Sequence, residues 1–177
     1  NDEWIRLTNT PNTEDYCPQF SGETIFTQNL RAPFMVPMRS SFGTILHNGL
    51  LYMCGGHQGP EHTYPKESFT DNFNVYDKRI NNWRELAPRP AKAHGYTLAA
   101  AGDYIYAFGG FAYNEGTKPA WKSIDSIDRY DIRTNTWTTI GKLTKARSSN
   151  VAVTVGDKVY LIGGWDATPK KLNDYEG

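Results

Sequence analysis

The chain has 177 residues, enough to bury a substantial apolar core in one domain of ordinary size. Its 19 basic and 19 acidic side chains give a formal net charge of zero, and no basic run stands out, so the charge pattern gives no support to nucleic acid as a partner. No apolar stretch approaches membrane-spanning length, so we expect no membrane span.

The first segment, residues 1–35, begins with a stretch that matches part of a repeat found later in the chain, and a loop-like insertion follows that stretch. Its opening, "NDEWIRLTNTP", matches "NNWRELAPRP", which begins at residue 81. Between Tyr16 and Phe34, two prolines and a glycine favour a loop. We therefore interpret residues 1–35 as the fourth strand of a preceding unit plus an insertion loop.

A four-stranded unit is predicted over residues 36–88. Residues 41–56 contain a strand, an Asn-Gly turn and a second strand, which is a strong signal for a β-hairpin. A variable loop follows, and "NFNVYD" and "WRELAP" then predict a third and a fourth strand joined by a polar turn.

The same pattern returns in residues 89–143, where the hairpin "YTLAAAGDYIYAFGG" has a Gly-Asp turn and the later strands are "SIDRYD" and "WTTIGKL". Residues 144–177 contain only the first hairpin of a further unit, "VAVTVGDKVYLIGG". No segment shows the apolar period of a helix, so the expected fold class is all-β, built from four-stranded antiparallel units.

Three kinds of residue recur with a spacing of 54. A glycine pair closes the second strand of each unit, a tyrosine lies in the third strand, and a tryptophan begins the fourth. The residues concerned are Gly55, Gly56, Gly109, Gly110, Gly163, Gly164, Tyr76, Tyr130, Trp83 and Trp137. Glycines fit where the backbone turns sharply or packs too closely for a side chain, so we assign the whole set to structure.

The glycine pair, the Tyr-Asp and the tryptophan at these offsets resemble the kelch motif, and the resemblance covers nearly the whole chain. It implies a kelch-like β-propeller with radially packed, four-stranded antiparallel blades. The chain then holds two full blades and partial blades at both ends, an incomplete ring, because propellers usually close with four or more blades. We expect the remaining blades to come from a longer parent chain or from another copy.

Because strands alternate in direction, the loop after each glycine pair and the join between blades share one rim. Exposed aromatic and arginine side chains suit recognition, so we predict that this rim binds a protein or peptide. The candidate residues are Arg39, His57, Gln58, His94, Phe111, Tyr113, Trp121, Arg147 and Trp165. The long loop after Gly56 also brings Tyr64 to this rim. The resemblance to kelch-like adaptors implies an acidic ligand at Arg39 and Arg147, although Ala93 departs from that pattern. The alternative is that these arginines pair with carboxylates of their own blades.

An enzyme is the alternative function, because some kelch-like propellers process sugars as epimerases of sialic acid or as oxidases. Glu61 and Glu115 could supply an acid/base pair, and Arg39 or Arg147 a group for a substrate carboxylate. A Zn or Cu site at His57, His62 and His94 is a weaker alternative, because loop histidines more often form local hydrogen bonds. We predict no cofactor and no metal.

The two cysteines, Cys17 and Cys54, do not make a disulfide scaffold. Cys54 lies in an apolar strand just before a glycine pair, where a small buried thiol is expected. The alternative is a bridge between the two, which would indicate an oxidising compartment.

Overall fold

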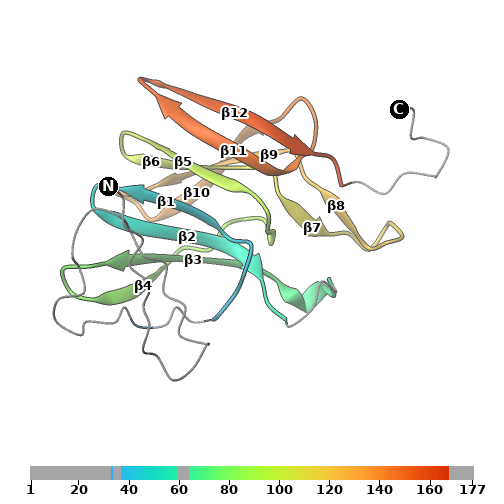
Figure 1. Cartoon of the computed structure of the whole chain (residues 1–177), viewed down its shortest axis with the longest axis horizontal. Helices are drawn as coiled ribbons and strands as arrows, with labels where there is room; N and C mark the ends of the chain where they lie inside the picture. The colour runs from blue at the N-terminus through green and yellow to red at the C-terminus, as the bar shows by residue number, and fades with distance from the viewer. Residues whose placement is uncertain (1–32, 34–36, 60–63, 168–177) are drawn as a thin grey trace, which may run out of the picture.

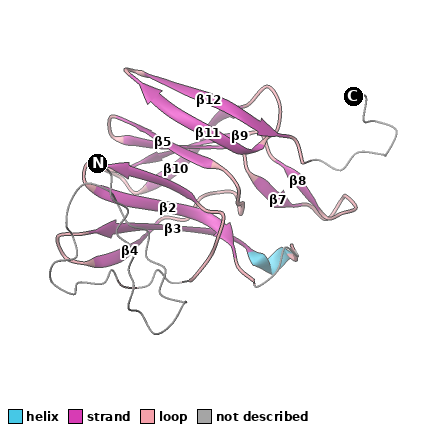
Figure 2. Cartoon of the chain, viewed as in Figure 1, coloured by secondary structure: helices cyan, strands magenta, loops and turns pink. Residues whose placement is uncertain are grey.

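The described part of the chain is built from antiparallel β-strands (Figure 2). In the computed structural model it comprises residues 33, 37–59 and 64–167. Apart from one 3-10 turn at Lys66–Ser68, the regular elements in these ranges are strands, and no helix among them is long and apolar enough to cross a membrane. The all-β class is therefore confirmed, whereas the interpretation of residues 1–35 falls almost wholly outside the described residues.

The first blade is an antiparallel sheet with the strand order β1-β2-β3-β4. Its strands are β1 Gly43–His47, β2 Leu50–His57, β3 Phe69–Asp77 and β4 Asn82–Leu86. The β1–β2 connection is the expected Asn-Gly turn: Asn48 and Gly49 have φ angles of 50° and 74°, the positive values that a two-residue hairpin turn of this hand requires. The turn sets the register, which pairs His47 with Leu50.

The second blade repeats this sheet with the order β10-β9-β6-β5. Its strands are β5 Thr97–Ala101, β6 Tyr104–Phe108, β9 Ser126–Asp131 and β10 Thr136–Lys142. Where the sequence predicts only a variable loop, the chain forms a further hairpin from β7 Phe111–Tyr113 and β8 Trp121–Ser123. Strands of three residues are too short to show a convincing alternation, which is why this hairpin was not predicted.

A third sheet, the antiparallel pair of β11 Ser148–Val155 and β12 Lys158–Trp165, follows the second blade. The first strands β1, β5 and β11 lie against one another in succession, so the sheets are arranged about a common axis (Figure 1). This is the arrangement of a β-propeller. The face of β11 and β12 that points away from the second blade is exposed, including Val153 at 43% and Ile162 at 58%.

The main core lies between the first and second blades. The ring of Phe73 is fully buried, and its centroid lies 4.7 Å from that of Tyr130 and 5.2 Å from that of Trp137. Burying an aromatic side chain of this size stabilises a fold by about 1.5–3 kcal/mol. Further buried residues of this core are Tyr52, Cys54, Val75, Tyr96, Leu98, Ile105 and Ala107.

The repeated tyrosines and tryptophans also make repeated hydrogen bonds. Each tyrosine hydroxyl donates to an asparagine side chain in the following turn, and each indole N–H donates to a backbone carbonyl of the chain fifty residues earlier. The pairs are Tyr76 with Asn81, Tyr130 with Asn135, Trp83 with Pro33 and Trp137 with Ala87. These bonds hold the outer strand of each blade in a fixed position, so the blades form a rigid support for the loops.

Candidate binding rim

Backbone pairing brings the loop after each glycine pair beside the residues that precede each first strand. The pairs are Ser40 with His57, His94 with Phe111, and Ser148 with Trp165. All three lie at the end of the blades opposite the β1–β2 turn. We call this end the rim.

The glycine pairs allow neighbouring blades to approach closely at the rim. Gly55 has a φ of 65°, and a Cβ at this position would collide with the carbonyl oxygen of Ala93 and the hydroxyl oxygen of Tyr96. The N–H of Gly56 donates to the same Ala93 carbonyl at 3.0 Å. A side chain would therefore strain the backbone and also push the blades apart.

An arginine donates to the carbonyl of the first glycine in each pair. The distances are 2.6 Å from Arg39 Nε to Gly55 O, 3.0 Å from Arg89 Nη2 to Gly109 O, and 2.9 Å from Arg147 Nη1 to Gly163 O. The second blade has Ala93 where the others have arginine, and Arg89, four residues earlier, makes the equivalent bond. The hydrogen bond from an arginine to the first glycine is therefore present in all three units, but in the second blade the arginine comes from a different position in the repeat.

Arg39 makes a further hydrogen bond within its own blade, in which its Nη2 donates to Asn74 Oδ1 at 2.7 Å. Its partial burial lowers the pKa of the guanidinium. Among the described residues, its hydrogen-bond acceptors are carbonyl and amide oxygens, not the carboxylates that the alternative interpretation named. A ligand at Arg39 would have to compete with these acceptors.

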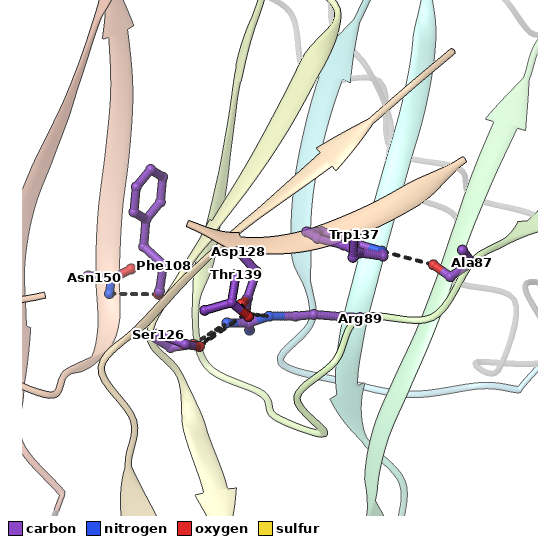
Figure 3. Close-up of polar contacts among 9 residues, drawn as sticks. Ala87, Arg89, Phe108, Ser126, Asp128, Trp137, Thr139 and Asn150 are labelled. Atoms are coloured by element: carbon purple, nitrogen blue, oxygen red, sulfur yellow. Dashed lines mark hydrogen bonds and ion pairs between the residues drawn. The ribbon is translucent and has the colours of Figure 1, made fainter. Parts of the chain in front are cut away.

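Arg89 is the centre of a buried polar network at the join between the first and second blades (Figure 3). The side chains of Arg89 and Asp128 are 0% and 1% exposed, and Arg89 Nε donates to Asp128 Oδ2 at 2.8 Å. The hydroxyls of Ser126 and Thr139 donate to the same carboxylate at 3.0 and 2.7 Å. The ring of Tyr96 covers the guanidinium, 4.3 Å from its Cζ. A buried pair with this many partners fixes the join in place.

Five of the candidate rim residues meet in one group of rings, which we call the aromatic cluster. Its members are His57, Tyr64, Phe69, His94, Phe111, Tyr113 and Trp121. The ring of Tyr64 lies at the centre, with its centroid 5.2 Å from that of His94 and 5.0 Å from that of Phe111. Tyr64 was expected on this rim as part of the long loop after Gly56, whereas Phe69 was not predicted, because the segment before β3 shows no repeat.

The aromatic cluster has a buried base and an accessible outer layer. His57, Phe69, His94 and Phe111 are buried, whereas Tyr64, Tyr113 and Trp121 are half-buried. Lys66 Nζ lies 3.9 Å from a carboxylate oxygen of Glu115 and 5.8 Å from the ring centroid of Tyr113, so the loop of the first blade contacts the β7–β8 hairpin of the second. The cluster therefore has support from both blades.

The other predicted rim residues lie outside the aromatic cluster. Gln58 is half-buried, and its backbone N–H donates to the carbonyl of Ser68 at 2.9 Å. Trp165 is 59% exposed at the end of β12, and its carbonyl accepts a hydrogen bond from the Ser123 hydroxyl at 3.4 Å. Arg147 lies at the join before β11.

Of the three histidines proposed as metal ligands, the structure describes two, His57 and His94, and places them close together. The ring centroids of His57 and His94 are 5.5 Å apart, whereas His62 and Glu61 lie outside the described residues. In the part of the chain that the structure describes, no group of three or more His, Cys, Asp or Glu side chains is placed to hold a metal ion. The three-histidine grouping stays untested.

Cys54 is a free and fully buried thiol, and Cys17 lies outside the described residues. Burial raises the pKa of the Cys54 thiol from 9.0 to about 11. The thiol therefore stays protonated at neutral pH and has the character of a packed core side chain.

Comparison with known proteins gives three matches to the family model described as Kelch motif, over residues 38–90, 92–144 and 146–175. Kelch-like protein 9 of Mus musculus is 27% identical over 137 residues, which are 76% of this chain and 21% of that protein. Kelch-like protein 13 of Homo sapiens is 26% identical over 137 residues, 76% of this chain and 20% of the relative. The chain thus spans about a fifth of the length of these relatives.

Among solved structures, that of YjhT has the same fold, with a TM-score of 0.58 and 19% sequence identity. The likeness covers 72% of this chain and 35% of that one, and at this identity it shows the fold alone. The propeller fold and the repeat are therefore confirmed together. The three matched segments cover most of the sequence, and the chain belongs to the Kelch motif family.

Proposed function

We propose that the chain is a protein-binding module and that its aromatic cluster is the contact surface. The observation that carries this proposal is the build of the cluster: rings on a buried base, with Tyr64, Tyr113 and Trp121 half-buried above it on the rim. Large aromatic side chains are enriched at the centres of protein interfaces. Rings that are already fixed by packing also lose little entropy when a partner binds.

In this proposal, the blades over residues 36–88 and 89–143 are the framework, and the loops after Gly56 and Gly110 carry recognition. The hydrogen bonds of the glycine pairs and of Arg89 fix where these loops start. Recognition through variable loops on a rigid β-scaffold is a common arrangement.

Site-specific photo-crosslinking tests this proposal. A photoreactive phenylalanine analogue replaces Tyr113 in the aromatic cluster or, as the matched control, Ile80 in the β3–β4 turn at the opposite end of the blade. Ile80 is 60% exposed, so the control probe is accessible to any protein in solution.

After irradiation in an extract of the source cells, we expect discrete protein adducts at Tyr113 that are missing at Ile80. Adducts at Ile80 with none at Tyr113 would contradict the proposal, and so would identical patterns at both positions. A thermal melt of each variant confirms that the replacement has not unfolded the protein.

A further inference from the structure

At the edge of the aromatic cluster, a lysine of the first blade lies over a ring of the second. Lys66 Nζ is 5.8 Å from the ring centroid of Tyr113 and 3.9 Å from a carboxylate oxygen of Glu115. Within the described ranges, Glu115 is the one carboxylate at salt-bridge distance from this ammonium group. An aromatic ring and a carboxylate therefore already hold a cation at this point of the rim.

This contact is weak enough for another cation to take its place. The side chain of Lys66 is 68% exposed and that of Glu115 is 80% exposed, so both charges remain in water, where an ion pair contributes little to stability. By contrast, the guanidinium of Arg89, which lies over the Tyr96 ring, is buried and paired with Asp128. Arg89 is thus part of the framework, whereas Lys66 can leave its ring without loss of the fold.

The surroundings of the Tyr113 ring suit a cation from outside the chain. Tyr113 and Trp121 are directly opposite each other in β7 and β8, so their side chains lie on the same face of the hairpin. The ring of Tyr64 packs on that of Trp121, with the centroids 5.9 Å apart. All three side chains are half-buried, so each retains a part that a ligand can reach. The faces of aromatic rings carry negative partial charge and attract ammonium and guanidinium groups.

Glu115 adds a full negative charge beside these rings. It follows Tyr113 by two residues, in the β7–β8 connection, and its carboxylate reaches the ammonium that lies over the Tyr113 ring. Lys122, the residue after Trp121 in β8, has its side chain on the opposite face of the hairpin, because successive side chains of a strand alternate. The face with the rings therefore combines aromatic side chains with a carboxylate, which is a combination that recognises a basic side chain.

We propose that the aromatic cluster binds a basic side chain of the protein partner, over the Tyr113 ring and beside Glu115, in the place that Lys66 holds in the free protein. This inference rests on the proposed function and adds the chemistry of the partner. An arginine fits best, because a guanidinium group is planar, stacks on aromatic rings and pairs with a carboxylate through two N–H groups. Lys66 is then an internal competitor for the site. The proposal concerns a different part of the rim from Arg39 and Arg147, for which the resemblance implies an acidic ligand.

The test follows the indole N–H signal of Trp121 by NMR during titration with three short peptides of equal length. The peptides are identical except for one central residue, which is arginine, the neutral norleucine or glutamate. The indole signal of Trp137, whose N–H donates to the carbonyl of Ala87 near the opposite end of the blade, is the internal control.

Two protein variants change the proposed site in opposite directions. Glu115→Gln removes the carboxylate that meets the ligand, and Lys66→Ala removes the internal competitor. The matched controls are Glu67→Gln and Lys92→Ala, which make the same changes of charge at exposed positions that have no ion pair among the described residues.

We expect the arginine peptide to shift the Trp121 signal and to bind at least about threefold more tightly than the norleucine peptide, with the glutamate peptide weakest. Glu115→Gln should weaken binding of the arginine peptide about threefold and Lys66→Ala should tighten it about twofold, while both controls change it less. Equal affinity for the arginine and norleucine peptides, or unchanged affinity in Glu115→Gln, would overturn the basic preference but leave the aromatic contact surface standing. Tightest binding of the glutamate peptide, weaker binding by Lys66→Ala, or no shift of the Trp121 signal with any peptide would also overturn the inference, and the crosslinks at Tyr113 decide the proposed function separately.

Discussion

The first seam, where the first and second blades meet on the rim, and the second seam, where the second blade meets β11, have the same backbone bonds but different side chains. In the first seam, the N–H of Arg89 donates to Asp71 O, and its side chain forms the buried pair with Asp128. In the second seam, Leu143 N–H makes the equivalent backbone bond to Asp125 O, but the Leu143 side chain is apolar and forms no ion pair. The backbone bonds are thus common to both seams, whereas a buried ion pair is found, among the described residues, at the first seam alone.

Replacing Arg89 with methionine should give the largest effect. The change leaves Asp128 buried without its partner, which costs about 3–5 kcal/mol of the free energy of unfolding. Urea unfolding followed by tryptophan fluorescence measures this, with Arg84→Met on the exposed surface of β4 as the control. A loss below about 1 kcal/mol would mean that the first seam does not depend on the pair. Adding Asp128→Leu to Arg89→Met should restore part of the loss, because no charge then remains buried.

Alanine at the first glycine of a pair should cost most where the neighbouring blade covers it. Gly109 and Gly163 have φ angles of 61° and 65°, but a Cβ at Gly109 would collide with the carbonyl of Arg147, whereas one at Gly163 meets nothing within 4 Å. We expect Gly109→Ala to cost about 3 kcal/mol and Gly163→Ala about 1 kcal/mol, the cost of backbone strain alone. Equal losses in urea unfolding would show that close approach of the blades adds nothing to the requirement for glycine.

The first seam should also respond to alkaline pH through Cys54. Because the folded pKa is raised to about 11, the neutral thiol is favoured by folding, and its contribution is complete below the pKa of the unfolded state near 9. The free energy of unfolding should therefore fall by up to about 2–3 kcal/mol as the pH rises from about 9 to 11. Cys54→Ala removes this dependence, so the difference between the two pH profiles isolates the thiol from tyrosines and lysines. If the free energy of unfolding fell with pH equally in Cys54→Ala and in the unmodified protein, the loss would not come from the Cys54 thiol.

The smallest effect on stability is expected at the second seam. Lys122→Glu with Lys145→Glu should change the free energy of unfolding by less than about 0.5 kcal/mol, because these charges have no carboxylate partner among the described residues. Chemical denaturation of the variant beside the unmodified protein measures this. A loss of more than about 2 kcal/mol would place the lysines in the structural framework and remove the contrast between the seams.

The fold was largely predictable because each blade uses strong local signals at a fixed period. The Asn48-Gly49 turn, the glycine pairs and the tyrosines of the third strands specify hairpins and strands with little help from distant residues. The β7–β8 hairpin was not predictable, since its three-residue strands are stabilised by contacts with another blade, such as that between Lys66 and Tyr113.

The site was predictable only in part, for a related reason. Strand direction placed His57, His94 and Phe111 on one rim, and the structure brings their rings together. Strand direction could not reveal that the Tyr64 ring lies at the centre of this group, or that Arg89 replaces the missing arginine at position 93. Both depend on packing between blades rather than on the repeat. An arginine just before a join, in the one blade that lacks it in the usual place, was the available signal.

Hydrogen–deuterium exchange with and without a protein partner identified by crosslinking at Tyr113 tests the central claim, that the rim is the binding surface, most directly. The account predicts slower exchange in the loop and β7–β8 hairpin over residues 111–123 and in the join over residues 143–150, with no change in the turns at residues 47–49 and 78–81. Protection confined to those turns, or no protected segment at a saturating concentration of the partner, would contradict it.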